Sequence, residues 1–233
     1  MGPVLSIINS GALNSGYASV LYLTDANPEI ERRSLLDAIN RKLDGIVIYT
    51  GDSVANLDIF EQLLEQNIPV IFFDRYYKEI NAHFVGSNTK KYIDIAINYL
   101  NEKGANDIYC LTRNSSVSTL VEAEEQFNSI TLSHGIDPST RIVKWDDTNS
   151  YINYTQDAYN ASIELLKNVS KGTAFLTLQV QFAIGLLRAI KDSGLEPLDY
   201  YIATIGIVPD DLIDFECNLI QIDHQPTEIG NAL

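Results

Sequence analysis

Four consecutive residues that can hydrogen-bond or stack follow one strongly apolar run of the sequence. The run IPVIFF, residues 68–73, is rich in β-branched and aromatic side chains and predicts a buried strand. Asp74, Arg75, Tyr76 and Tyr77 come directly after it. A carboxylate accepts hydrogen bonds from hydroxyl groups and a guanidinium donates through a planar fork, so the first two suit a hydroxyl-bearing ligand. The alternative for this pair is a salt bridge at the strand end. The two tyrosines could stack on the ring of a ligand, and their alternative is packing at the surface.

A second group of polar residues lies in the stretch LTRNSSVS, residues 111–118, which is the weakest seam between two periodic halves of the chain. Ser87 and Asn88 precede a predicted helix, so a capping role is favoured for them over ligand binding. In the seam, one side chain is expected to donate to a ligand, and the candidates are Arg113, Asn114, Ser115 and Ser116.

Three later groups of residues also lie at the carboxyl ends of predicted strands. Trp145 offers an aromatic wall for a ligand, with a core position as the alternative. Gln179 and Gln181 offer neutral donors and acceptors. Asp223 ends the last predicted strand and His224 follows it, and for His224 a structural hydrogen bond is favoured over contact with a ligand.

Helical and strand periodicities alternate along the chain, which predicts an α/β fold with parallel sheets covered by helices on both faces. Asn56 is expected to cap the helix that follows it, and Gly104 and Gly135 to end two others. Predicted helices cover residues 28–39, 56–67, 89–104, 118–135, 154–168 and 181–194. Predicted strands cover residues 17–24, 44–50, 68–73, 107–112, 141–145, 173–178, 200–206 and 218–223. Ligands of such sheets bind beyond the carboxyl ends of the strands.

Composition narrows the classes of function. The 233 residues carry a net charge of -15 with no basic stripe, so this polypeptide alone is expected to bind DNA poorly. No apolar run is long enough to predict a membrane span. Cys110 and Cys217 lie in apolar runs, which favours buried free thiols and a reducing, cytoplasmic setting over a single disulfide.

Motifs for catalysis are absent from the sequence. It contains no GxSxG, P-loop, GxGxxG or HExxH pattern, and its histidines lack metal-ligand spacing. We therefore expect no enzyme activity, no cofactor and no metal site.

Five pieces occur in a familiar order: LDGIVIY, IPVIFFDR, FVGSN, AIGLLRAIKDSGL and HQPTEIG. Over nearly the whole chain they resemble the effector-binding region of LacI/GalR transcription regulators, whose fold is shared with periplasmic sugar-binding proteins of the ribose type. The resemblance implies two Rossmann-like lobes, here expected at 1–112 and 113–222, with 223–233 crossing back. It also implies that the family's first strand is missing, that residues 4–17 form part of its first helix or a shortened strand and turn, that the family's last helix and strand are missing, and that no helix-turn-helix is present.

The resemblance also implies a ligand site, in which Asp74 and Arg75 match a pair that ribose-type proteins use on sugar hydroxyls. Two usual ligand groups are replaced, because Gln179 and Val180 stand where the family has Asn-Asp, and Glu122 and Ala123 stand where an Arg is usual. These departures favour a neutral ligand with few hydroxyls, a nucleoside-like ring or a relocated site, and a site that has lost its function is a further alternative. The full set of expected ligand-binding residues is Asp74, Arg75, Tyr76, Asn88, Arg113, Ser115, Trp145, Gln179, Gln181, Phe182, Val208, Asp223 and His224.

By this resemblance the chain is expected to be the effector-sensing part of a homodimeric regulator. It would bind a sugar or sugar-like molecule between its lobes and control operator DNA through a separate helix-turn-helix. The alternative is an exported sugar-binding protein that feeds a transporter, which would use the same cleft as a monomer. An enzyme on a similar scaffold is a third class, and it would need a perturbed acid, base or nucleophile in the cleft.

Overall fold

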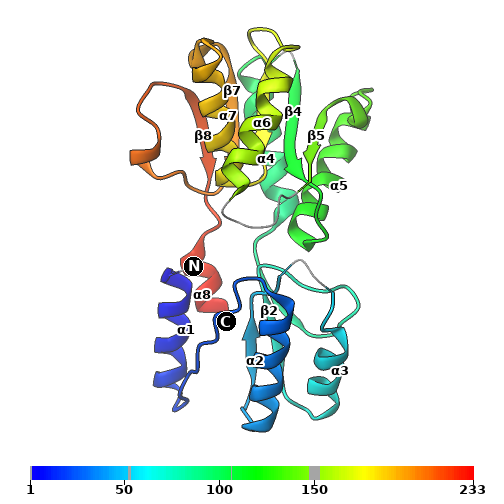
Figure 1. Cartoon of the computed structure of the whole chain (residues 1–233), viewed down its shortest axis with the longest axis vertical. Helices are drawn as coiled ribbons and strands as arrows, with labels where there is room; N and C mark the ends of the chain where they lie inside the picture. Colours follow the sequence, from blue (N-terminus) through cyan, green and yellow to red (C-terminus); the bar gives the residue numbers. More distant parts are fainter. Residues whose placement is uncertain (1, 52–53, 106, 147–152) are drawn as a thin grey trace. The chain divides into compact units, whose positions relative to one another are not determined.

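The computed structural model describes residues 2–51, 54–105, 107–146 and 153–233, and its elements are labelled in Figure 1. The chain divides into two compact units. Unit 1 holds the residues up to Ser87, Ser116–Thr119 and Gln225–Leu233. Unit 2 holds Asn88–Ser115 and Leu120–His224.

Unit 1 contains a parallel sheet in the order β1-β2-β3. Leu35 of one helix and Phe60 and Leu63 of another pack on Val70 and Phe72 of the central strand, which explains why residues 68–73 are so apolar. The strands are β1 (Ile46–Ile48), β2 (Val70–Phe73) and β3 (His83–Val85). The helices are α1 (Gly2–Asn14), α2 (Pro28–Asn40), α3 (Leu57–Glu65) and α8 (Pro226–Ala232). The prediction did not include β3, α1 as a complete helix, or α8.

The prediction of a strand over residues 17–24 is wrong. These residues form neither helix nor strand, and Tyr17, Val20, Leu21 and Leu23 are exposed. In the described part of unit 1 the sheet ends at β1, and residues 17–24 do not pair with the open edge of that strand. An extended segment that pairs with no strand is not stable as a strand in water.

Unit 2 contains a larger parallel sheet in the order β5-β4-β6-β7-β8. Its strands are β4 (Ile108–Arg113), β5 (Ile142–Trp145), β6 (Ala174–Thr177), β7 (Tyr201–Ile205) and β8 (Asn218–Ile222). Its helices are α4 (Thr89–Glu102), α5 (Ser118–Ser133, the first two residues of which group with unit 1), α6 (Tyr154–Leu166) and α7 (Val180–Asp192). The short 3-10 helices are η1 (Pro138–Thr140), η3 (Pro197–Asp199) and η4 (Asp210–Leu212).

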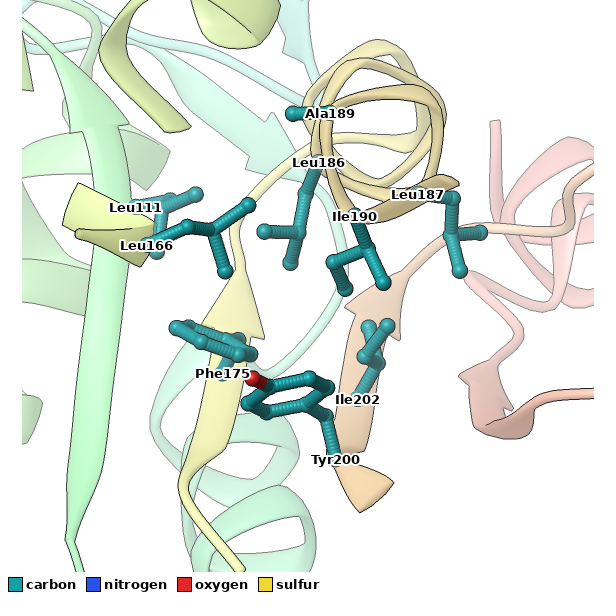
Figure 2. Close-up of a cluster of buried hydrophobic side chains, with 9 residues drawn as sticks. All are labelled: Leu111, Leu166, Phe175, Leu186, Leu187, Ala189, Ile190, Tyr200 and Ile202. Carbon is teal, nitrogen blue, oxygen red and sulfur yellow. The ribbon is translucent and has the colours of Figure 1, made fainter. Parts of the chain in front are cut away.

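The main core of unit 2 lies between its sheet and the pair α6 and α7. Figure 2 shows Leu186 and Ile190 of α7 pointing towards Phe175 and Ile202 on the sheet. Because side chains alternate along a strand, Cys110 and Leu176 point to the opposite face, and α4 contacts β6, β7 and β8. Helices therefore cover both faces, as the periodicity predicts.

The units differ from the lobes expected from the sequence at 1–112 and 113–222. Residues 88–112 group with unit 2, because α4 contacts strands of the second sheet and β4 lies inside that sheet between β5 and β6. The amphipathic pattern of α4 shows that one face is buried, but it does not show against which sheet.

Several local signals in the sequence have the predicted effect. The Asn88 side chain caps α4 by accepting a hydrogen bond from the Lys91 backbone at 3.0 Å. Gly104 and Gly135 follow α4 and α5 with φ of 78° and 74°, which suits glycine. The prediction that Asn56 caps α3 is wrong, because its side chain makes no cap hydrogen bond and points to α2 instead.

Two further observations bear on class. Cys110 is a buried free thiol and Cys217 a half-buried one, so the free-thiol interpretation is confirmed and the disulfide alternative is not. No helix in the described part of the chain is long and apolar enough to cross a membrane.

Candidate functional site

The carboxyl end of β2 places Asp74 and Arg75 beside the end of β1. Arg75 is only 5% exposed, and its guanidinium carbon lies 4.3 Å from the centre of the Tyr49 ring. Its Nε is 3.8 Å from a carboxylate oxygen of Asp74, so the salt bridge considered as the alternative is present in a long form. Arg75 is therefore held by a ring and a carboxylate, while Asp74 stays partly exposed.

Asp74 has an unusual backbone conformation. Its φ is 64°, in the left-handed region, and its N–H donates to Val85 O at 2.9 Å while the next N–H, of Arg75, donates to Phe73 O at 2.7 Å. Aspartate tolerates this region better than most residues, although at some cost in free energy. The turn is thus stabilised by pairing with β3 and directs two charged side chains off the end of the strand.

The two tyrosines that follow have different environments. Tyr77 is buried, with its ring 5.6 Å from the rings of both Phe60 and Phe72. Tyr76 is half-buried against Phe84, with 4.8 Å between ring centres. Tyr76 therefore keeps an accessible surface, while Tyr77 belongs to the core of unit 1.

In unit 2 the ends of β4 and β5 bring Arg113 and Trp145 together. The two are paired in register on neighbouring parallel strands, so their side chains share one face of the sheet. Arg113 is fully buried, and its guanidinium carbon lies 4.8 Å from the centre of the Tyr154 ring. Phe182 closes the group, with its ring 4.8 Å from Trp145 and 6.2 Å from Tyr154.

These residues, Arg113, Trp145, Tyr154 and Phe182, are called the aromatic–arginine cluster below. The indole Nε1 of Trp145 is a buried donor that has no hydrogen-bond partner among the residues that the structure describes. A buried indole N–H normally finds an acceptor, and a bound ligand can supply one. Sequence reasoning missed Tyr154. The available signal was an aromatic residue at the first position of a helix that follows β5.

The other expected residues of unit 2 have varied positions. Gln179 precedes α7 without capping it, and Gln181 is exposed in its first turn. Val208 is 2% exposed and belongs to a core cluster with Ala183 and Ile184, so its side chain has a packing role. Asn88 is the cap of α4.

The last expected residues follow β8. Asp223 is exposed, whereas His224 is half-buried and its ring lies 5.8 Å from the Tyr92 ring in an edge-on arrangement. In the seam, Ser115 is half-buried and Asn114 donates through its side chain to Asp146. The structure thus brings Arg113, Trp145 and Phe182 into one cluster and Asp74 and Arg75 into another, each within its own unit.

The chemistry of both groups is that of binding. They offer guanidinium donors, a carboxylate and aromatic faces, which suit a polar molecule that also has apolar faces. Within the described ranges, no group of three His, Cys, Asp or Glu side chains could hold a metal ion.

Comparison with known proteins identifies the fold. Residues 10–214 match the family model described as periplasmic binding protein domain. This chain belongs to that family. The match covers most of the chain, including β1 to β3 of unit 1 and β4 to β7 of unit 2.

Relatives of this periplasmic binding protein domain are transcription regulators. Catabolite control protein A of Staphylococcus epidermidis is 23% identical over 182 residues, which are 77% of this chain and 52% of that protein. The arabinose metabolism transcriptional repressor of Halalkalibacterium halodurans is 30% identical over 79 residues, covering 33% of this chain and 21% of the repressor. The chain therefore spans about half the length of the first of these relatives.

Solved structures agree on the fold. A protein described as a probable LacI family transcriptional regulator from Corynebacterium glutamicum has a TM-score of 0.82 at 19% identity, covering 99% of this chain and 85% of that one. A LacI family regulator from Lactobacillus casei with bound glucose has a TM-score of 0.74 at 13% identity, covering 99% and 84%. The predicted fold class and the resemblance to LacI/GalR regulators are confirmed, and these relatives are regulators and not enzymes.

Proposed function

We propose that this chain is the effector-sensing part of a LacI-type transcription regulator. The observation that carries the proposal is the family match over residues 10–214 together with relatives named as transcription regulators. A small molecule would bind to the domain and favour one of its conformations over another, which is how a ligand shifts a conformational equilibrium. The sensing part would pass that shift to a DNA-binding segment carried outside this chain.

The proposed ligand is a sugar or a sugar-like compound. It would lie at the carboxyl ends of strands, where parallel sheets bind their ligands. The candidate contacts are Asp74 and Arg75 within unit 1 and the aromatic–arginine cluster within unit 2. Sugar rings have apolar faces that pack on indole and hydroxyl groups that bond to guanidinium and carboxylate. Two neighbours in fold support this class, since one holds glucose and another, from Alkaliphilus metalliredigens, holds D-xylulofuranose.

The proposed partners are a second copy of the protein and operator DNA. With a net charge of -15, the present chain would repel phosphate, so contact with DNA falls to the separate helix-turn-helix. The proposed location is the cytoplasm, where such DNA lies and where two free thiols would stay reduced.

The competing function is an exported binding protein for a transporter, which would use the same ligand site. Oligomeric state separates the two in sedimentation velocity. A dimer supports the regulator, whereas a monomer that binds a sugar tightly favours the transporter alternative.

Ligand binding can be measured through Trp145, because it is the only tryptophan. We would titrate the protein with glucose, sucrose, xylulose and a set of nucleosides, following indole fluorescence and thermal unfolding. A ligand present at about 100 times its Kd should raise the free energy of unfolding by about 2.7 kcal/mol. A change in Trp145 emission that saturates with one sugar would support a site at the aromatic–arginine cluster.

A pair of matched variants tests the role of Arg113. Arg113→Lys keeps the charge and loses the planar fork, so sugar affinity should fall by about 10–100-fold, the value of one charge-assisted hydrogen bond. Arg141→Lys is the control, because Arg141 also lies over a tyrosine, Tyr109, at 5.1 Å, but at the amino end of β5. Equal losses in both variants, or none in Arg113→Lys, would count against the proposed site.

A further inference from the structure

A buried carboxylate in unit 1 is linked to the segment Asp74–Tyr77 through a chain of contacts. Glu31 of α2 is 3% exposed, and Thr50, Asn56 and Tyr77 around it are 1%, 1% and 6% exposed. A buried carboxylate is costly unless hydrogen bonds satisfy it. No Lys, Arg or His in the described ranges forms an ion pair with Glu31, so hydrogen bonds carry the compensation. Glu31, Thr50, Asn56 and Tyr77 are called the Glu31 network.

The contacts of Glu31 reach both ends of the loop between β1 and α3. Asn56 Nδ2 donates to one carboxylate oxygen at 3.0 Å and also to Pro28 O at 2.9 Å, which ties the start of α3 to the start of α2. The other oxygen accepts from Thr50 Oγ1 and from the Gly51 backbone N–H, each at 3.4 Å. This explains why Asn56 does not cap α3: its side chain is used on Glu31 and α2.

From Thr50 the network continues to the segment after β2. The Thr50 hydroxyl shares a hydrogen bond with the Tyr77 hydroxyl, whose ring is fixed between Phe60 and Phe72. Tyr49, the residue before Thr50, carries the Arg75 guanidinium on its ring. The loop after β1 is therefore attached on one side to Glu31 and on the other to both ends of Arg75–Tyr77.

We propose that Glu31 is a positioning residue for Asp74 and Arg75. Its carboxylate holds Thr50 and Gly51, and through them Tyr49 and Tyr77, so that the two charged side chains keep one orientation before ligand binds. The part of this inference that concerns affinity rests on the proposed function. The part that concerns local order does not, because it can be observed without ligand.

The decisive variants keep the shape of the network. Glu31→Gln replaces one acceptor oxygen by an NH2 group, which is a donor. Both oxygens of Glu31 accept hydrogen bonds from neighbouring donors, so in either orientation of the amide at least one of these donors loses its partner. Tyr77→Phe removes only the hydroxyl bonded to Thr50 and keeps the aromatic packing. The matched controls are Arg32→Gln and Asp58→Asn. Each breaks an exposed ion pair of 2.7 Å that also links α2 to α3 but does not include a member of the Glu31 network.

Hydrogen–deuterium exchange of the ligand-free protein is the first readout. In Glu31→Gln we expect about tenfold faster exchange at the amides of Gly51 and Arg75–Tyr77, the effect of one lost hydrogen bond, with smaller changes at the start of α3 and none in unit 2. Tyr77→Phe should reproduce the increase at residues 75–77, and neither control should. Uniformly faster exchange across unit 1 in Glu31→Gln, or no change at 75–77 in Tyr77→Phe, would overturn the proposal.

Affinity for glucose, measured by Trp145 fluorescence, is the second readout. We expect Glu31→Gln and Tyr77→Phe each to weaken glucose about tenfold, with little further loss in the double variant because both break the same chain of contacts. The controls should stay within about twofold of wild type. Additive losses would contradict the relay through Thr50. If wild type binds neither glucose nor any other sugar of the titration set, that result counts against the proposed sugar function, and the exchange data alone then decide the positioning role.

Discussion

Replacing Gly185 by alanine tests the close packing of α6 against α7, the helix that carries Phe182 into the aromatic–arginine cluster. A Cβ at Gly185 would lie 2.5 Å from Thr155 O, 2.8 Å from Ala158 Cβ and 2.8 Å from Tyr159 N. Carbon atoms do not approach this closely, and two of the three contacts are backbone atoms that cannot turn away. The helices must therefore separate in the variant.

The expected loss follows from two opposing terms. Overpacking a tight interface costs roughly 1–3 kcal/mol, and backbone contacts place this site near the upper end. Alanine returns about 1 kcal/mol through its better helix propensity. The net expectation is a decrease of about 2 kcal/mol in the free energy of unfolding, or about 4–8 °C in Tm for a chain of this length.

Urea unfolding followed by Trp145 fluorescence is the appropriate assay, because this residue lies in unit 2 beside α7. Gly11→Ala is the matched control. Gly11 lies inside α1, and a Cβ there meets nothing within 4 Å, so circular dichroism should show a gain of about 0.5–1 kcal/mol. If Gly185→Ala is as stable as wild type while Gly11→Ala is stabilised, α6 and α7 are not packed as closely as described.

Three further outcomes are expected. Burial raises the pKa of the thiols of Cys110 and Cys217. At pH 8 a thiol reagent should therefore modify neither rapidly in the folded protein, and it should modify Cys110 only after unfolding. Rapid modification of both would contradict this expectation. The Tyr22 hydrogen bond at 2.5 Å lowers the pKa of Asp37, so the stabilisation is present above the ordinary aspartate pKa and is lost as pH falls through the folded value. Asp37→Asn should therefore be less stable than wild type at pH 7, and the difference should shrink as the pH is lowered and Asp37 takes up a proton. Leu186→Ala should cost about 2–5 kcal/mol by urea unfolding, since this side chain is fully buried between α7 and the sheet; a loss below about 1 kcal/mol would mean that the site is loosely packed.

Much of the fold could be predicted from local sequence patterns. The alternation of apolar periods predicted the helices α2 to α7 and the strands other than β3, because burial on one face of a helix or on both faces of a strand is recorded in the spacing of apolar residues. The ends of α4 and α5 were predictable from Asn88, Gly104 and Gly135, since caps act within one turn. The place of Asp74 and Arg75 at the end of β2 was predictable because the apolar run of that strand stops directly before them.

The candidate site was only partly predictable. Arg113, Trp145 and Phe182 were named from strand ends and from the resemblance, but Tyr154, which lies under the Arg113 guanidinium, was not. Val208 was named and has a core position instead. In each case the deciding contact joins residues far apart in the chain, and no local pattern records such a contact.

Local patterns in the sequence record most of the helices and strands and show that charged and polar groups follow the strands. Where those segments and groups are used depends on contacts that form only in the folded chain. Residues 17–24 have the composition of a strand and stay irregular, because no described neighbour pairs with them. Asn56 has the position of a cap and instead bonds to Glu31, because packing brings a buried carboxylate within reach. Such outcomes depend on hydrogen-bond partners supplied by other elements, and those partners exist only once the chain has folded.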